Sequence, residues 1–174
     1  AAAGTPSNAT AKPATRPEVR SSAALVVDAR DSSVLFAQRD DAAVPIASIT
    51  KLMTALVVLE GRQPLDEMIT ITGADRDNAR GSPSRLGVGT RLSRGELLHL
   101  ALMSSENRAA QALGRSYPGG LTVFVRAMNT KAKALGMSRS RFADPTGLSS
   151  GNVASDRDLV KLVKAASADP LVRR

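Results

Sequence analysis

The sequence predicts an α+β fold that starts with one β-hairpin and continues mainly as helices. Two β-prone runs, at residues 23–28 and 33–37, are separated by a short polar turn, which is typical of a hairpin. Segments of helical length then follow, most of them bounded by capping or stop residues, with few strand-like runs between them. The 174 residues, of which 43% are hydrophobic, suffice for one globular domain or for a large piece of a bigger fold.

Composition limits the classes of function. Aromatic residues make up only 2% of the chain and offer few platforms for stacking on bases, so no nucleic-acid partner is expected. With no cysteine and a single histidine, His99, neither a disulfide nor a transition-metal site is expected, and no cofactor is predicted. The formal charge of +8 fits either a basic surface for an anionic polymer, membrane or cell wall, or mere solubility. Scattered basic residues favour solubility.

The first part of the chain differs from the rest. Residues 1–20 are rich in Ala, Thr and Pro and show no apolar period, which predicts a flexible lead-in before one ordered region at residues 21–174. No apolar run approaches the roughly 20 residues of a membrane span. The opening Ala1, Ala2 and Ala3 fit the remnant of a cleaved signal peptide, and fit an arbitrary boundary equally well.

The first predicted helix is the most apolar segment. Pro45 precedes an apolar stretch at residues 46–59, and Gly61 provides a stop. Because this stretch is apolar nearly all the way round, we expect a helix buried on most sides. Core-filling methionines are expected at positions 53, 103, 128 and 137.

The later elements have their own local signals. Ser93 and Glu96 form a capping-box pattern ahead of a helix at residues 97–103, in which His99 is expected to be structural. The strongest further strand candidate, residues 68–72, is isolated, so the sheet is expected to be unfinished, since a lone hairpin is marginally stable. Further helices are predicted at residues 107–114, at 121–135 with Gly136 as stop, and from a Ser155 cap to about residue 166.

Ser48 and Lys51 are the first candidates for chemistry. A serine in the opening turn of the buried helix would share a face with a lysine three residues later, at a Cβ separation of about 5–6 Å. Partial burial depresses the pKa of an ammonium group, so the neutral amine can serve as a base for the hydroxyl. The alternative is a helix-capping serine followed by a solvated lysine. The position of Lys51 inside an apolar run favours the catalytic interpretation.

Ser105 and Asn107 form the second candidate pair. They lie two residues apart at a predicted helix boundary, where both side chains can point into a cleft. The hydroxyl can pass a proton, and the amide can fix a peptide group. A pair of capping residues is the alternative. Asp144 to Gly147 (Asp-Pro-Thr-Gly) predicts a turn.

The two motifs resemble those of a known enzyme class. Ser-x-x-Lys followed by Ser-x-Asn is similar to the penicillin-binding proteins and class A β-lactamases. Three longer segments resemble the low-molecular-mass D-alanyl-D-alanine carboxypeptidases and endopeptidases. They are Pro-Ile-Ala-Ser-Ile-Thr-Lys-Leu-Met-Thr-Ala at 45–55, Ala-Leu-Met-Ser-Ser-Glu-Asn-Arg-Ala-Ala at 101–110 and Phe-Ala-Asp-Pro-Thr-Gly-Leu at 142–148. Tyr-Pro-Gly-Gly at 117–120, with Ala-Met-Asn at 127–129 and Leu-Gly-Met at 135–137, looks most like the endopeptidase branch.

The resemblance covers the chain from about Ser22 onward and implies a fold and a set of roles. The fold would be the β-lactamase/DD-peptidase transpeptidase-like fold, with residues 21–174 forming its hairpin and helical region as a partial catalytic domain. Ser48 would form an acyl-enzyme, its backbone N–H would supply half of an oxyanion hole, and Lys51 would take its proton. Ser105 would relay a proton to the leaving amine, and Asn107 would hold the substrate backbone.

The resemblance also implies partners and a location. Peptidoglycan stem peptides or cross-links would be the substrate, β-lactams would acylate Ser48, and the protein would be periplasmic, with association to the membrane surface as an option. One family element, Lys-Thr-Gly or Lys-Ser-Gly on a strand, does not occur in this sequence. We therefore expect an N-terminal portion, weakly active or inactive alone: a truncation, a proteolytic fragment, or one part of a pair that a complementing C-terminal segment completes.

Three questions stay open at this level. The residues do not separate endopeptidase from carboxypeptidase. A β-lactamase would need a deacylating carboxylate within Glu-x-x-Leu-Asn, which is absent, and Glu106 inside the Ser-x-Asn motif is a poor substitute. A non-catalytic peptidoglycan-binding fragment is the alternative from a different class.

Overall fold

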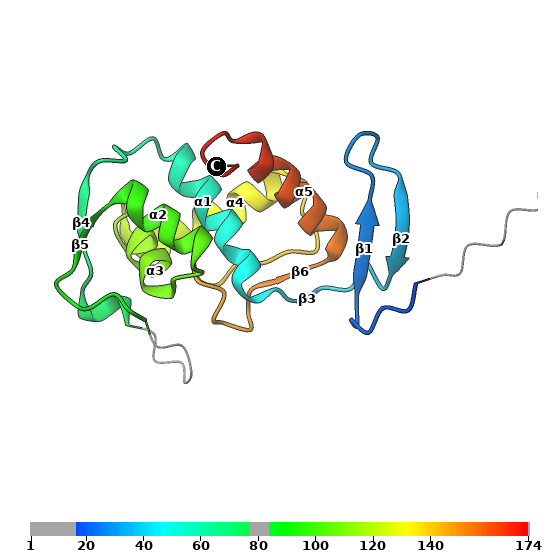
Figure 1. Cartoon of the computed structure of the whole chain (residues 1–174), viewed down its shortest axis with the longest axis horizontal. Coiled ribbons are helices and arrows are strands. Elements are labelled where there is room, and N and C mark those ends of the chain that lie inside the picture. The colour runs from blue at the N-terminus through cyan, green and yellow to red at the C-terminus, as the bar shows by residue number, and fades with distance from the viewer. Residues whose placement is uncertain (1–16, 77–83, 174) are drawn as a thin grey trace, which may run out of the picture.

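The computed structural model describes residues 17–76 and 84–173. Its elements in chain order are β1 (Ala24–Val27), β2 (Val34–Gln38), β3 (Val44–Pro45), α1 (Thr50–Glu60), β4 (Met68–Thr70), β5 (Arg91–Ser93), α2 (Arg94–Met103), α3 (Asn107–Arg115), α4 (Gly120–Ala134), β6 (Val153–Ala154) and α5 (Asp156–Ala168). Short 3-10 turns lie at Ala47–Ile49 and Gly73–Asp75. Figure 1 shows a helical body around α1, with the β1–β2 hairpin at one end and β4–β5 at the other. The predicted α+β class is confirmed.

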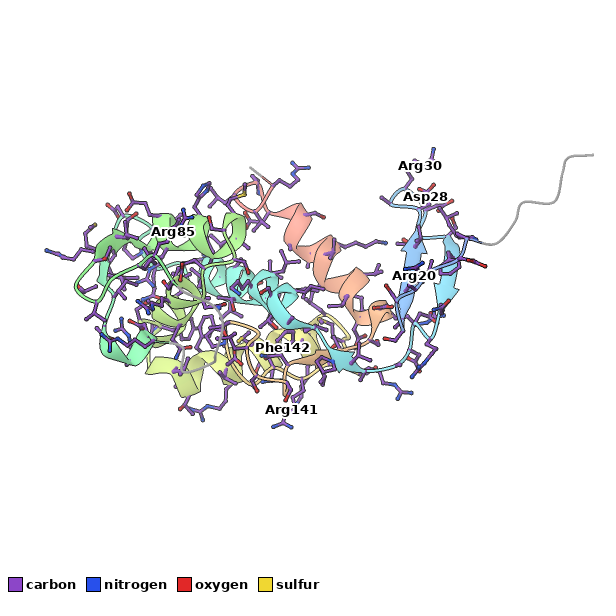
Figure 2. All side chains as sticks on the ribbon, turned by 60° about the horizontal axis from the view of Figure 1, so that its bottom comes forward. Arg20, Asp28, Arg30, Arg85, Arg141 and Phe142 are labelled. Carbon is purple, nitrogen blue, oxygen red and sulfur yellow. The ribbon has the colours of Figure 1, made fainter. Side chains whose placement is uncertain are left out.

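The N-terminal hairpin forms as predicted. β1 and β2 pair antiparallel, with a register irregularity between Val26 and Val27. At the tip, Arg30 closes an ion pair of 2.7 Å on Asp28, and Figure 2 shows the two side chains together there. Among the described residues the hairpin pairs with no other strand, and Leu35 on β2 is 65% exposed. The hairpin therefore leaves apolar surface uncovered.

The other strands form two small separate ladders. β4 pairs with β5, so the strand predicted at residues 68–72 is confirmed over Met68–Thr70. This ladder lies at the opposite end of the molecule from the hairpin, so β4 does not extend the hairpin's sheet (Figure 1). β3 pairs with β6 over two residues each, which ties the chain just before Ser48 to the segment just before α5.

Helix α1 is the centre of the core. It contacts α2, α3, α4 and α5, which together surround it on most sides, as its apolar sequence predicts. The residues of α1 that are buried are Thr50, Lys51, Met53, Thr54, Ala55, Leu56, Val57 and Val58. Large side chains from neighbouring elements, including Leu113, Phe124 and Met128, are fully buried against this helix layer. Lys51 is thus an ionisable side chain held within a largely apolar core.

Helix ends mostly follow the local signals. The capping box is present, since Ser93 Oγ accepts from the N–H of Glu96 and the Glu96 side chain accepts from the N–H of Ser93. Ser155 caps α5, and Gly136 follows α4 with φ of +70°. The start of α1 differs from the prediction. The chain passes through the Ala47–Ile49 turn first, so Ser48 lies just before the α-helix rather than inside it.

One expectation about α2 is wrong. Met103 is not core filler: its side chain is 69% exposed, whereas the methionines at 53, 128 and 137 are buried. Met103 lies two positions after the buried Ala101, which places it on the opposite side of the helix. His99, on the same helix, is exposed.

Two features of the chain bear on its organisation. The lead-in predicted at residues 1–20 falls outside the described residues except for 17–20, which form neither helix nor strand. Within the described ranges, none of the helices combines the length and the apolar character that crossing a bilayer requires.

Candidate active site

Ser48 and Lys51 come together at the start of α1. Ala47, immediately before the serine, has φ of +45°, a left-handed conformation that is unusual for a residue with a Cβ. Ser48 is exposed, whereas Lys51 is only 3% exposed. The Lys51 Nζ lies 3.2 Å from the Ser48 Oγ. The two residues are therefore on one face, as their spacing predicts.

The Lys51 amine is surrounded by oxygen atoms from two other parts of the chain, one near residues 105–107 and the other at Thr146. It donates to Asn107 Oδ1 at 2.8 Å and to the Thr146 carbonyl oxygen at 2.7 Å. Ser105 Oγ lies 3.3 Å away, a little farther than these two. The two shortest contacts thus go to oxygens that only accept hydrogen bonds, and the two serine hydroxyls lie at longer range.

The turn between α2 and α3 supplies Ser105 and Asn107. Ser105 has φ of +53°, in the position that follows a helix and is usually held by glycine. Its hydroxyl donates to Ser48 Oγ at 2.9 Å. Asn107 is the first residue of α3 and is buried, so its amide reaches Lys51 from the helix terminus. The structure therefore brings together all four residues that the sequence singles out.

A loop before β6 forms the remaining wall. The Asp144 carboxylate accepts hydrogen bonds from the backbone N–H groups of Thr146 at 2.6 Å, Gly147 at 2.8 Å and Ser149 at 2.8 Å. The buried hydroxyl of Thr54 on α1 donates to the Pro145 carbonyl at 2.7 Å. These bonds confirm the turn predicted from Asp-Pro-Thr-Gly and aim the Thr146 carbonyl at Lys51. Just before this loop, the side chains alternate in direction: Arg141 points outward and Phe142 points into the core (Figure 2).

Sequence reasoning missed the contribution of Thr146. Its contact with Lys51 is made by a backbone carbonyl, which no side-chain motif identifies. The sequence did offer one indication of an ordered loop, which is Asp144. An aspartate ahead of Pro and Gly often accepts hydrogen bonds from the backbone N–H groups of the residues that follow it, and so orders a turn. A polar residue inside the apolar α1, Thr54, was a second signal that another segment must supply an acceptor.

Electrostatics of the site follow from burial and two carboxylates. Burial lowers the pKa of Lys51 below 10.5, and the nearby charges of Asp144 and Glu106 raise it only in part. Burial on its own raises the pKa of Asp144, but hydrogen bonds from Thr146, Gly147 and Ser149 outweigh it, so the pKa lies below 3.8. The lysine is thus closer to neutral than a surface lysine, while Asp144 stays ionised.

A groove with a volume of about 450 Å³ adjoins the Ser105 turn. Its lining residues are Arg85, Leu86, Leu100, Ser104 and Glu106. Among the described residues, no cluster of three or more His, Cys, Asp or Glu side chains has the arrangement of a metal site.

The geometry can perform nucleophilic chemistry. A neutral amine has two N–H groups and one lone pair, and the Asn107 and Thr146 oxygens accept both N–H groups. The lone pair is then left for the Ser48 hydroxyl, whose oxygen also accepts from the Ser105 hydroxyl. An exposed serine, a buried amine of lowered pKa and a second hydroxyl in contact with the first are the components of an acyl-transfer site.

Comparisons with known proteins give a consistent result. The family model described as D-alanyl-D-alanine carboxypeptidase matches residues 9–173. The D-alanyl-D-alanine endopeptidase of Pseudomonas aeruginosa is 52% identical over 155 residues, covering 89% of this chain and 50% of the relative. The D-alanyl-D-alanine endopeptidase of Escherichia coli K12 is 48% identical over 164 residues, covering 94% of this chain and 53% of the relative. The chain spans about half the length of these curated relatives.

Solved structures agree in fold. The DD-transpeptidase of Streptomyces K15 superimposes with a TM-score of 0.83 at 28% identity, covering 90% of this chain and 64% of that one. A D-alanyl-D-alanine carboxypeptidase from Mycobacterium tuberculosis H37Rv gives a TM-score of 0.77 at 30% identity, covering 90% and 59%. The helical body and the hairpin therefore share the architecture of DD-peptidases, as the sequence predicts.

Proposed function

Because this chain belongs to the D-alanyl-D-alanine carboxypeptidase family, we propose that Ser48 is the nucleophile of a serine DD-peptidase acting on peptidoglycan. The substrates are stem peptides that end in D-alanine or cross-links made through D-alanine. Lys51 is the base, Ser105 the proton relay and Asn107 the residue that holds the substrate backbone. The contact of one buried amine, Lys51 Nζ, with Ser48, Ser105, Asn107 and the Thr146 carbonyl is the observation that carries this proposal.

The first half of the reaction acylates the enzyme. The Ser48 Oγ attacks the carbonyl carbon of a D-alanyl residue while its proton passes to the Lys51 amine, which gives a tetrahedral oxyanion and a lysine ammonium. The proton then moves from Lys51 through the Ser105 hydroxyl to the leaving nitrogen. The C–N bond breaks, the amine departs, and the acyl group stays on Ser48 as an ester.

The second half returns the enzyme to its starting state. Water attacks the ester carbonyl, and its proton passes to the neutral Lys51. Collapse of the tetrahedral intermediate breaks the bond to the Ser48 Oγ, which takes back a proton from Lys51. The product leaves as a carboxylate, so one water is consumed for each peptide bond cleaved. A β-lactam undergoes only the acylation half of this reaction and therefore leaves Ser48 acylated.

The backbone around Ser48 supports stabilisation of the oxyanion. The N–H of Ser48 lies in the 3-10 turn that leads into α1, and the positive end of a helix dipole favours negative charge there. Gly147 packs against this turn: a Cβ added to it would lie 1.9 Å from the Ala47 carbonyl oxygen and 3.0 Å from the Ser48 nitrogen. The loop that presents Thr146 thus also fixes the nucleophile's backbone.

Endopeptidase action on cross-links is the finer form of the proposal. The relatives at 43% to 52% identity carry the name D-alanyl-D-alanine endopeptidase, whereas relatives named carboxypeptidase are 28% to 34% identical. Because peptidoglycan lies outside the cytoplasm, the protein acts in the periplasm.

One assay tests the proposal and its alternatives. The protein is incubated with a purified cross-linked muropeptide dimer and with a pentapeptide ending in D-Ala-D-Ala, and Ser48→Ala is the control. An ester on Ser48 found by peptide mapping supports the proposed nucleophile. Monomers released from the dimer support an endopeptidase, and D-alanine from the pentapeptide supports a carboxypeptidase. Retention on peptidoglycan sacculi without any adduct would favour a binding fragment. Rapid turnover of nitrocefin would favour a β-lactamase.

A further inference from the structure

The turn that carries Ser105 and Asn107 is held in an unusual conformation. Ser105 occupies the left-handed region with φ of +53°, which costs a residue with a Cβ about 1–2 kcal/mol. Both of its functional neighbours, Ser48 and Lys51, depend on this conformation for their contacts. Some other part of the structure must therefore hold the turn in place, and Glu106 is the residue between Ser105 and Asn107.

Glu106 is fixed by hydrogen bonds at both its backbone and its side chain. Its N–H donates to the Leu100 carbonyl at 3.2 Å, and its own carbonyl accepts from the N–H of Ala110 at 3.2 Å. Its Oε1 accepts from the N–H of Arg108 at 3.0 Å and from the Ser84 hydroxyl at 2.7 Å. One residue thus links the end of α2, the start of α3 and a separate segment of the chain.

That separate segment is braced a second time. Ser84 Oγ, besides donating to Glu106, accepts from the N–H of Leu86 at 3.1 Å. The Arg108 guanidinium donates to the Leu86 carbonyl. Residues 84–86, which include the Arg85 labelled in Figure 2, therefore attach to the turn through both Glu106 and Arg108.

Glu106 also acts on Lys51 through its charge. The charged groups that bear on the Lys51 amine are Asp144 in the loop before β6 and Glu106 in the turn; Ser105, Asn107 and Thr146 contribute only neutral groups. Both carboxylates raise the pKa of Lys51 against the larger effect of burial. A fixed anion on the turn therefore limits how far burial depresses the basicity of the amine.

We propose that Glu106 is a positioning residue: anchored to Ser84 and Arg108, its carboxylate holds the strained turn that presents Ser105 and Asn107 to Lys51, and places a fixed negative charge near the amine. The inference rests on the proposed function, since Ser105 and Lys51 are its reacting groups. Glu106 itself touches neither substrate nor the reacting atoms. Its Oε1 already accepts two hydrogen bonds within the protein, so that oxygen is not free to activate a water molecule.

Three variants separate the two effects of this carboxylate. Glu106→Gln keeps an acceptor oxygen but removes the charge, Glu106→Ala removes both, and Ser84→Ala removes one donor while keeping the charge. Glu60→Gln, which removes a carboxylate paired with Lys131 elsewhere on the surface, is the matched charge control. Unfolding in urea verifies that each protein is folded.

The readouts do not require substrate. Titration of Lys51 is followed by NMR on protein with isotope-labelled lysine. The Lys51 signal is identified as the one that disappears in the Lys51→Arg variant. Removing the anion must move this titration to lower pH in Glu106→Gln and in Glu106→Ala, and leave it in place in Ser84→Ala and Glu60→Gln. Amide exchange at residues 104–107 must accelerate about tenfold in Glu106→Ala, the scale of one hydrogen bond to a charged group, and less in Glu106→Gln.

The acylation rate by a β-lactam completes the test. The low-pH limb of its profile must shift in Glu106→Gln to lower pH, in parallel with the Lys51 titration. Wild-type amide exchange in Glu106→Ala would overturn the positioning role, and a wild-type Lys51 titration in Glu106→Gln would overturn the electrostatic role. A wild-type protein that no β-lactam acylates would count against the proposed function, while the NMR and exchange results would still decide the role of Glu106.

Discussion

The Ala47 carbonyl oxygen and Gly147 are packed so closely that a Cβ on the glycine would lie 1.9 Å from that oxygen. Gly147 also has φ of +88°, which glycine adopts without strain. One hundred residues of chain separate the two, and their contact joins the turn of the nucleophile to the loop that presents the Thr146 carbonyl. The site therefore depends on a backbone contact that tolerates no side chain.

Gly147→Ala is expected to destabilise the protein by about 3 kcal/mol, because it adds a steric overlap to the cost of a left-handed residue. Urea unfolding measures the effect. Gly136→Ala is the control: this glycine also has positive φ, at +70°, but open space surrounds its Cβ position, so only about 1 kcal/mol is expected. Equal losses in the two variants would show that the contact with Ala47 has no energetic weight.

Ser105→Gly is expected to make the protein more stable and less active at once. Glycine removes the strain at φ of +53° and gains about 0.5 kcal/mol after its own entropic cost. Loss of the hydroxyl removes the proton relay and slows acylation by about 100-fold. Stability is measured in urea and acylation with a fluorescent penicillin.

Ser105→Ala is the matched variant, since it loses the same hydroxyl but keeps the strain. It is expected to show the same slow acylation without the gain in stability. A Ser105→Gly protein that acylates at the wild-type rate would remove Ser105 from the mechanism.

Lys51→Arg is expected to abolish acylation, with a loss of about 1,000-fold, because a guanidinium stays protonated and cannot serve as the base. In the wild type the acylation rate rises with pH and levels off above the pKa of Lys51, which burial keeps below 10.5. Rates from pH 5 to pH 10 give the profile. Lys131→Arg, an exchange at a surface ion pair, should leave it unchanged. A pH-independent wild-type rate would contradict the role of Lys51.

Asp144→Asn is expected to cost about 2 kcal/mol at pH 7, because the carboxylate accepts several hydrogen bonds that order the loop. The folded-state pKa of Asp144 lies below 3.8, so its ionisation contributes stability above that pH and loses it as pH falls through the folded-state pKa. The difference between wild type and variant should shrink below pH 3.8. Urea unfolding at pH 7 and pH 3 tests this, with the exposed Asp66→Asn as control. A constant difference would contradict the assignment.

Local patterns account for much of the fold. The capping box at Ser93 and Glu96 and the stop at Gly136 are short-range signals, and the structure confirms both. The hairpin is also local, since its strands are joined by one turn. Pairing between distant segments could not be predicted this way. β4 pairs with β5, which lies more than twenty residues later and which the sequence did not predict as a strand.

The site divides along the same line. Ser48 and Lys51 lie three residues apart, so helical spacing alone predicts their contact. Ser105 and Asn107 lie 54 and 56 residues from Lys51, and their convergence was expected only from the resemblance to a known family. The Thr146 carbonyl was missed because every residue has a backbone carbonyl, so no sequence motif can show which one will contact Lys51. Met103 was misplaced because it was judged by its apolar character alone, although its position in the helix is opposite the buried Ala101.

The central claim is that Ser48 is an acylated nucleophile, and intact mass after prolonged incubation with benzylpenicillin tests it most directly. The account predicts one adduct of the mass of the drug on the wild-type protein and none on Ser48→Ala, with peptide mapping placing the adduct on Ser48. The same adduct on Ser48→Ala, or an adduct on the wild-type protein that peptide mapping places on another residue, would contradict it.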